Sequence, residues 1–374
     1  MKKILISAYA VSPIRGSECA VGWEITKRLG QYFDVTVLMC ETFPSGVGCA
    51  AEVEHYIEKN GSIKNVSYVC VPMPRRSKIF TWLHDNGFWP AYYWGYSCWQ
   101  KSAFETAEKL HVVKKFELVY QLNMIGFREP GYIWRLPVPF VWGPTNGFHN
   151  IPFSFLKTFK GKEYFFQHLR YFFNKLQILL PSRARKAAKK ASIVWCVDEV
   201  SKSKLEKWGA KTDLLQETGL ASLTDINFDV NKKFENPKVL RLVWSGNIMT
   251  RKALRILIDA LIMNKDLNFS LVVLGDGPLM QKMKIRAQSI NHKIVWKGRL
   301  SKYEALEHVK SSHLLIHTSL SEGTANVILE AIGYGVPVVC HDTCGMSLVV
   351  NEKNGFKIPY NDFETSTLLI FFNH

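Results

Sequence analysis

Two glutamates stand eight positions apart in the segment SEGTANVILEAIGYGVPVV, which runs from Ser321 to Val339. The spacing of apolar residues in VILEAIGYG predicts a helix over 325–334, so Glu322 precedes this helix and Glu330 lies inside it. An apolar strand pattern ends at Ser319, just before the loop. Glu322 is therefore expected at the edge of a sheet, beside the free backbone amides of a helix start.

This arrangement suits a ligand that carries both a diphosphate and a sugar. Helix N-terminal amides carry about half a positive charge and favour anions. A carboxylate on a mostly apolar helix face needs a partner, and two ribose hydroxyls suit Glu330, while Glu322 would face a sugar. A structural alternative stays open, in which Glu322 only starts the helix and Glu330 pairs with a lysine. The residues expected to supply the amides are Gly323, Thr324, Ala325 and Asn326.

Apolar β-branched runs alternate with helical patterns along the whole chain. The expected strands of the first half are KKILISAY, DVTVLMC, VSYVCVP, ELVYQLN, PFVWGP, SIVWCVD and TDLLQETG. Those of the second half are VLRLVWSG, FSLVVLGDG, KIVWKG, LLIHTS and PVVCHD. This alternation predicts an α/β protein with two parallel sheets covered on both faces. We expect a first domain over 1–220, a linker over 221–238 and a second domain over 239–374, with a site in the cleft between the domains.

The first strand leads into a glycine-containing loop before a helix. Gly16 and Ser17 lie in this loop, and Gly22 lies in the helix that follows. Glycine lets backbone amides approach a phosphate or a sugar closely, but the same pattern also fits a plain tight turn. A second strand-to-helix turn, GDGP over 275–278, is interpreted as structural.

The composition limits the class of protein. The chain has 374 residues, 47% of them hydrophobic, and no apolar run approaches the about 20 residues that a membrane span needs. The first residues, MKKILISAYAV, are interpreted as a buried strand rather than a signal peptide, so a cytoplasmic protein is expected. The eight scattered cysteines are expected to be reduced, and Cys340 and Cys344 lack a second ligand pair for zinc, so we expect no metal.

The net charge of +16 predicts an anionic partner. The segment over about 153–190 interleaves aromatic and basic residues and contains Glu163 as its one acid. Such a segment is typical of contact with an anionic membrane surface, although it also fits a helical insertion packed on the first domain with a solvated basic face. No nucleic-acid-binding motif is recognised, so nucleic acid is not an expected partner.

The pair of glutamates resembles the E-x7-E signature of the family 4 retaining glycosyltransferases, which have the GT-B fold. The similarity extends over nearly the whole chain. It includes VWSGNIMTRKALRILIDAL, where a strand ends in glycine and a basic pair follows, together with VVLGDGP, WKGRL and the first loop GSECAVGWE.

The resemblance implies roles for individual residues of the donor site. Glu322 would act as the catalytic residue at the donor sugar, Glu330 would bind the ribose hydroxyls, and Lys252 would bind the diphosphate beside Gly246. Many members carry an arginine where this chain has Asn247, and Arg251 is expected to supply that second cation. The family generally needs no metal, so a nucleotide-diphosphate sugar is the expected co-substrate and no cofactor is expected.

Two further features depart from the family pattern. Many members have a histidine after the strand that matches PFVWGP; here Asn146 and His149 occupy that loop and are the acceptor-side candidates. The resemblance also implies a further helix after DFETSTLLIFFNH, so the C-terminal part is expected to be short.

The expected function is a retaining glycosyltransferase that acts on a lipid-linked or polysaccharide acceptor in cell-surface polysaccharide biosynthesis, peripheral on the inner face of the cytoplasmic membrane. Two alternatives stay open. One is a catalytically inactive binding or scaffold protein of the same fold. The other is a sugar-nucleotide epimerase, for which no convincing acid/base set is found around the sugar.

Overall fold

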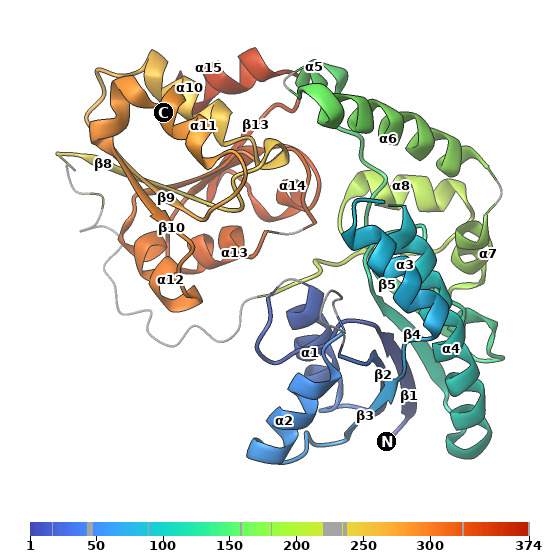
Figure 1. Ribbon diagram of the computed structural model, residues 1–374. Coiled ribbons are helices and arrows are strands. Elements are labelled where there is room, and N and C mark those ends of the chain that lie inside the picture. The colour runs from blue at the N-terminus through green and yellow to red at the C-terminus, as the bar shows by residue number, and fades with distance from the viewer. Residues whose placement is uncertain are drawn as a thin grey trace. The chain divides into compact units, whose positions relative to one another are not determined.

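The computed structural model describes residues 1–16, 18–42, 48–88, 90–157, 159–180, 182–219, 234, 238–323 and 325–372. The chain forms two compact units (Figure 1). The first unit contains residues 1–148 and 177–217, and the second contains residues 149–176 and 218–374.

The first unit is built on a seven-stranded parallel sheet with the order β3-β2-β1-β4-β5-β6-β7. Its strands are β1 (Lys3–Ala8), β2 (Asp34–Cys40), β3 (Val66–Val71), β4 (Leu118–Asn123), β5 (Phe140–Thr145), β6 (Ile193–Cys196) and β7 (Thr212–Leu214). Ile4 of β1 pairs with Val35 on one side and with Leu118 on the other. The strand order therefore changes direction between β1 and β4.

Helices cover both faces of this sheet. They are α1 (Glu18–Leu29), α2 (Ala50–Asn60), α3 (Arg75–Asp85), α4 (Ala91–Lys114), α7 (Arg183–Lys190) and α8 (Glu199–Lys207), with the short η1 (Ile133–Arg135). Alternate residues of β1 enter different apolar clusters, Leu5 on one face and Ile4 and Ile6 on the other. A strand buried on both faces must be apolar along its length, which explains the continuous apolar runs of the sequence.

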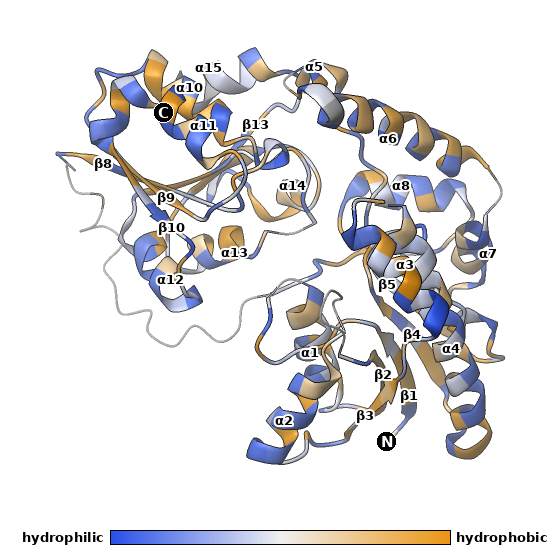
Figure 2. Ribbon diagram, viewed as in Figure 1, coloured by the Kyte–Doolittle hydropathy of each residue, from blue (hydrophilic) through white to orange (hydrophobic). Residues whose placement is uncertain are grey.

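The second unit holds a six-stranded parallel sheet with the order β10-β9-β8-β11-β12-β13. Its strands are β8 (Leu240–Ser245), β9 (Phe269–Leu274), β10 (Ile294–Gly298), β11 (Leu314–His317), β12 (Val338–His341) and β13 (Gly355–Ile358). The same alternation appears in β8, since Leu242 and Trp244 enter one cluster and Val243 the other. Figure 2 shows hydrophobic colours within strands of both sheets.

The helices of the second unit follow its strands and include two from the middle of the chain. They are α5 (Phe153–Leu156), most of α6 (Gly161–Leu179), η2 (Thr250–Lys252), α10 (Leu254–Met263), α11 (Met280–Arg286), η3 (Gln288–Lys293), α12 (Lys302–Ser311), α13 (Asn326–Gly333), α14 (Met346–Val349) and α15 (Phe363–Phe372). The two parallel sheets give the expected α/β class with two Rossmann-like domains.

The division of the chain differs from the expected one in the middle. Residues 149–176, expected within the first domain, pack with the second unit. Apolar packing accounts for this difference. Phe155 is fully buried, and its ring stacks on that of Tyr360 with 5.1 Å between the centroids. The Ser154 hydroxyl donates to the Asn361 carbonyl at 2.5 Å. Most of the expected linker over 221–238 lies outside the described residues.

All twelve expected strands are present, and β13 was not expected. Its sequence, GFKI, is short and stands among polar residues, so periodicity gave no signal. In the described part of the chain, no helix has the length and apolar character required to cross a bilayer.

Candidate functional site

In the second unit, the expected site residues gather after the carboxyl ends of β8 and β11. These two strands are neighbours, and the strand order changes direction between them. Ligands of open parallel sheets bind at such a switch point. The loop after β8 contains Gly246, Arg251 and Lys252, and the loop after β11 contains Glu322 and Gly323.

Hydrogen bonds fix these two loops to each other. The Leu320 N–H donates to the Arg251 carbonyl at 2.9 Å, and the Thr318 hydroxyl donates to the Lys252 carbonyl at 2.8 Å. The Trp244 indole N–H in turn donates to the Thr318 hydroxyl at 3.0 Å. The two cations are therefore held against the loop that carries Glu322.

Glu322 forms the centre of an ion cluster. It pairs with Lys252, lies 3.4 Å from the Arg251 guanidinium, and accepts from the Ser319 hydroxyl at 2.9 Å. Burial alone would raise its pKa, but the nearby charges of Lys252 and Arg251 outweigh this effect and the pKa is lowered. Glu322 is therefore ionised at neutral pH although its side chain is only 15% exposed.

His317, the last residue of β11, lies beside this cluster and was not expected as part of the site. Burial, with the charge of Lys252 as the second cause, lowers its pKa to about 3. Among the described residues, neither ring nitrogen has a hydrogen-bond partner. A neutral buried imidazole thus stands next to the ion cluster. The signal in the sequence was a histidine closing the apolar strand LLIH directly before the loop.

Glu330 lies within α13, as expected, and its side chain is 16% exposed. Its carboxylate lies 3.5 Å from the ammonium of Lys302, a side chain that is 77% exposed. The lysine partner of the structural alternative is therefore present. Because Lys302 is so exposed, it can move aside for two hydroxyls at little cost in free energy.

The start of α13 differs slightly from the expected one. The helix begins at Asn326, and Ala325 precedes it in extended backbone without a side-chain cap hydrogen bond. The first-turn amides therefore receive no capping oxygen from Ala325. Thr324 lies outside the described residues.

The GDGP turn supports the loop after β8, as the structural interpretation predicted. The Ile248 N–H donates to the Asp276 carbonyl at 2.8 Å. Gly277 has φ +159°, and a Cβ on it would lie 2.4 Å from the Asn247 side-chain oxygen. Only glycine fits here, so this turn packs directly beneath the loop that presents Gly246 and Asn247.

In the first unit, the glycine-containing loop follows β1 at the other switch point. A Cβ on Gly22 would lie 2.1 Å from the Ala10 carbonyl oxygen, so close packing of α1 on β1 accounts for this glycine without a ligand. Around Gly16 there is open space. Ser17 lies outside the described residues.

A pair of carboxyl groups, not expected from the sequence, lies at this switch point. Burial, and then the charge of Glu217, raises the pKa of Glu18 to about 8. Glu18 also accepts a hydrogen bond from the Ile125 backbone amide, which opposes that shift. Burial, followed by the charge of Glu18, raises the pKa of Tyr92 well above its usual value. Glu18 stands in the quoted loop GSECAVGWE, but a single acid at a helix start gave no distinctive signal.

The two acceptor-side candidates fall in different units. Asn146 follows β5 in the first unit, where its backbone pairs with that of Ile125 and its side-chain oxygen accepts from the Gly147 amide at 2.6 Å. His149 belongs to the second unit and lines a small cavity together with Ser321, the residue before Glu322.

Within the described ranges, no group of three or more His, Cys, Asp or Glu side chains could hold a metal ion. Cys340 and Cys344 are buried and not joined in a disulfide.

Part of this chain resembles known proteins in sequence. Residues 240–368 match the family described as Glycosyl transferases group 1. Protein CapJ of Staphylococcus aureus is 33% identical over 98 residues, 26% of this chain and 25% of that protein. Alpha-monoglucosyldiacylglycerol synthase of Streptococcus pneumoniae is 23% identical over 111 residues, 29% of this chain and 25% of that protein. The matched segments thus span about a quarter of these two relatives.

Solved structures resemble the chain over nearly its whole length. The lipopolysaccharide outer core galactosyltransferase WaaB has a TM-score of 0.63 and 13% identity, covering 98% of this chain and 88% of that one. Anabaena HepE in complex with UDP has a TM-score of 0.55 and 15% identity, with the same coverage. Identities this low show the fold alone. Residues 240–368 therefore form a domain of the group 1 glycosyl transferases, within a chain that has the GT-B fold.

Proposed function

We propose that the protein is a retaining glycosyltransferase of family 4, which moves a sugar from a nucleotide-diphosphate sugar to a lipid-linked or polysaccharide acceptor. The observation that carries this proposal is the cluster of Lys252, Arg251 and Glu322 at the β8/β11 switch point. Two cations beside the loop that leads into α13 suit a diphosphate. An ionised carboxylate next to them suits the hydroxyls of the sugar.

In this proposal, the cations act on the leaving group. Breaking the bond between the anomeric carbon and the diphosphate leaves extra negative charge on the phosphate oxygen, which Lys252 and Arg251 stabilise. The acceptor hydroxyl attacks from the face that the diphosphate leaves, and its proton passes to the departing phosphate oxygen. No protein base and no metal is required for this step. Glu330 holds the ribose hydroxyls and so fixes the nucleotide.

The relatives support the substrate classes. One is named a monoglucosyldiacylglycerol synthase, and another, from Bacillus subtilis, is named a putative teichuronic acid biosynthesis glycosyltransferase, TuaC, with 26% identity over 120 residues, 32% of this chain and 29% of that protein. HepE was solved with UDP. We therefore place this chain in cell-surface polysaccharide biosynthesis, with a nucleoside diphosphate sugar as donor.

The donor site is tested by thermal shift with UDP, GDP, ADP, TDP and CMP on the wild type and on Glu330→Ala. A nucleotide that binds the native state raises the melting temperature by mass action. We expect one nucleoside diphosphate to give a shift that Glu330→Ala loses. Glu307→Ala is the matched control, because Glu307 pairs with Lys310 on the exposed side of α12. A shift that survives in Glu330→Ala would contradict the ribose role.

Turnover of labelled donor sugars separates the alternatives. Transfer of label to a glycan or glycolipid, with the anomeric configuration kept, supports the proposal. Binding without turnover would favour the scaffold protein, and conversion of one sugar nucleotide into another would favour the epimerase.

We also propose that α6 rests on an anionic membrane surface at the inner face of the cytoplasmic membrane. Large apolar side chains on α6 and beside it are exposed. They are Phe153, Tyr164, Phe165, Phe166, Phe172, Phe173, Leu176, Leu179 and Leu180. Phe165, Phe172 and Leu176 recur at helical spacing, and Arg170 and Lys175 stand between them. Apolar side chains enter the headgroup region while basic ones bind anionic lipid.

Vesicle flotation tests this contact. Vesicles with anionic lipid should retain the wild type at low salt and release it at high salt, whereas Phe165→Ser/Phe172→Ser should stay in solution. Tyr303→Ser/Ile285→Ser is the control, since these side chains are 73% and 72% exposed on other helices. Equal binding of the two double variants would refute the role of α6.

A further inference from the structure

The first unit contains a cavity of about 840 Å³ that is separate from the sites described above. It lies among α4, η1 and the start of α7. Its lining residues are Lys101, Phe104, Glu105, Glu108, Tyr132, Trp134, Arg135, Ser182, Arg183 and Lys186. The volume falls in the range typical of small-molecule sites, about 300–1,000 Å³.

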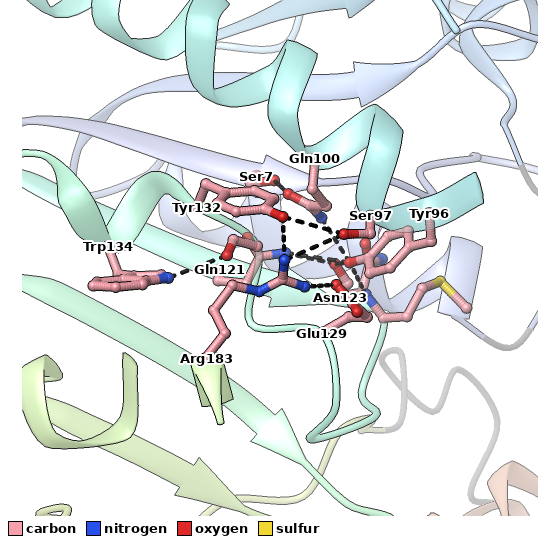
Figure 3. A network of polar contacts seen from close by, with 12 residues as sticks. Ser7, Tyr96, Ser97, Gln100, Gln121, Asn123, Glu129, Tyr132, Trp134 and Arg183 are labelled. Atoms are coloured by element: carbon pink, nitrogen blue, oxygen red, sulfur yellow. Dashed lines mark hydrogen bonds and ion pairs between the residues drawn. The ribbon is translucent and has the colours of Figure 1, made fainter. Parts of the chain in front are cut away.

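A polar network holds Arg183 and Tyr132, two residues of the cavity lining (Figure 3). Arg183 pairs with Glu129, donates to the Tyr132 hydroxyl, and lies 3.2 Å from the Ser97 hydroxyl. Its guanidinium also lies over the Tyr132 ring, 4.3 Å from the centroid. Arg183 thus has an acidic partner in Glu129, and its contacts hold the Tyr132 ring and hydroxyl in place.

The aromatic part of the wall has fixed orientation. The Trp134 indole N–H donates to the Gly131 carbonyl at 3.1 Å, a bond that Figure 3 shows. The Arg135 guanidinium lies 5.0 Å from the centroid of Tyr132 and 5.5 Å from that of Trp134. A held indole beside a cation offers an apolar face and a charge to the same ligand.

The remaining charges of the lining are not paired with one another. Within the described residues, Lys101, Arg135 and Lys186 have no carboxylate within ion-pair distance. Glu105 and Glu108 of α4 are exposed at the same cavity. Unpaired cations favour an anionic group, and carboxylates accept hydroxyl protons.

We propose that this cavity binds a negatively charged saccharide, a sugar that carries a carboxylate or a phosphate. The sugar ring packs on Trp134, the anionic group meets Arg135 and Lys186, and the carboxylates of α4 accept sugar hydroxyls. This second saccharide site holds a stretch of an acidic glycan outside the donor site. The inference does not depend on the proposed transfer reaction, because it concerns binding by the first unit alone.

Isothermal titration of the full chain tests the proposal. The probes are a hyaluronan tetrasaccharide, which carries carboxylates, glucose 6-phosphate, which carries a phosphate, and the neutral sugar maltotetraose. We expect at least one anionic probe to bind about tenfold more tightly than the neutral one, and tighter binding of the first or the second identifies the anionic group. Arg135→Ser/Lys186→Ser should weaken that binding about tenfold, and Trp134→Ala should weaken it too.

Lys109→Ser/Lys189→Ser is the matched control, because it removes two exposed cations from α4 and α7 outside the cavity. It should bind the anionic probe like the wild type, and unfolding temperatures should show that all variants fold. Saturating UDP should not displace the probe. Equal affinity for neutral and anionic sugars, equal loss in the control, or displacement by UDP would each overturn the proposal. Preferential binding of oligo(dT) at these residues would replace the saccharide with nucleic acid.

Discussion

The two units place acids at the same point of the same architecture but give them opposite electrostatic surroundings. Glu322 follows β11 of the second sheet and is surrounded by Lys252 and Arg251, which lower its pKa. Glu18 follows β1 of the first sheet, where burial and Glu217 raise its pKa to about 8. Each acid lies where its sheet order changes direction. The strand order thus determines where a site lies, and the neighbouring charges determine its chemistry.

The difference has a direct chemical meaning. An ionised Glu322 only accepts hydrogen bonds, and its cluster with Lys252 and Arg251 keeps a net positive charge that favours an anion. Glu18 holds its proton at neutral pH and can therefore donate as well as accept.

The largest expected effect comes from removing the main cation. Lys252→Ala should reduce kcat/KM for sugar transfer by about 10²–10³-fold, because the charge that develops on the leaving phosphate loses its stabilisation. Steady-state kinetics measure this loss. Lys310→Ala, which removes a lysine paired with Glu307 on exposed α12, should stay near the wild-type rate. A wild-type rate for Lys252→Ala would show that this cation does not assist the transfer, and the chemical role given to the second unit would be wrong.

The next effect concerns Glu18 and the pH dependence of stability. The native state binds the Glu18 proton more tightly than the unfolded state does. The contribution of Glu18 to stability is therefore fully present below the pKa that Glu18 has in the unfolded chain, and it is lost as the pH rises through about 8. Between pH 5 and pH 9, the free energy of unfolding should fall by about 2–4 kcal/mol more in the wild type than in Glu18→Gln.

Urea unfolding at both pH values measures this difference. Glu24→Gln on the same helix, at a side chain that is 46% exposed, should behave like the wild type. Identical pH profiles of Glu18→Gln and the wild type would mean that Glu18 is ionised in the native state, and the contrast with Glu322 would disappear.

A smaller change in stability, with the opposite dependence on pH, is expected from His317. Its pKa is lowered to about 3, so the native state binds fewer protons than the unfolded state and stability is lost as the pH falls from about 6.5 toward 3. Compared with the wild type, His317→Gln should lose about 1–3 kcal/mol less stability between pH 7 and pH 4. Thermal unfolding at the two pH values tests this expectation, with His308→Gln on α12 as control. A wild-type acid profile for His317→Gln would show that the imidazole is not held neutral.

The smallest expected effect tests whether the ion pair of Glu330 with Lys302 has a structural role. Its partner Lys302 is 77% exposed, so Lys302→Ala should change the free energy of unfolding by less than about 1 kcal/mol. The nucleotide-induced thermal shift should persist, because the ribose contact belongs to Glu330. A large loss of stability would instead support a structural role for this ion pair.

Much of the fold could be predicted from the sequence because parallel strands buried on both faces must be continuously apolar. This requirement made β1 and β8 recognisable from the apolar runs ILI and LVW. It failed for β13, whose four residues include Lys357 and have no apolar run. The unit against which α5 packs could not be predicted either, because nothing in the segment FSFL indicates which core will bury Phe155.

The sequence by itself determined the two-sheet α/β architecture and the order of strand, loop and helix around Glu322 and Glu330. These follow from local patterns of apolar spacing and helix starts. The tertiary structure alone decided which groups meet. Arg251 and Lys252 face Glu322 across about seventy residues of sequence, while Glu217 approaches Glu18 and Arg183 approaches Glu129 in the first unit. Charges and burial act through space rather than along the chain, so the pKa of each acid depends on neighbours that no local pattern contains.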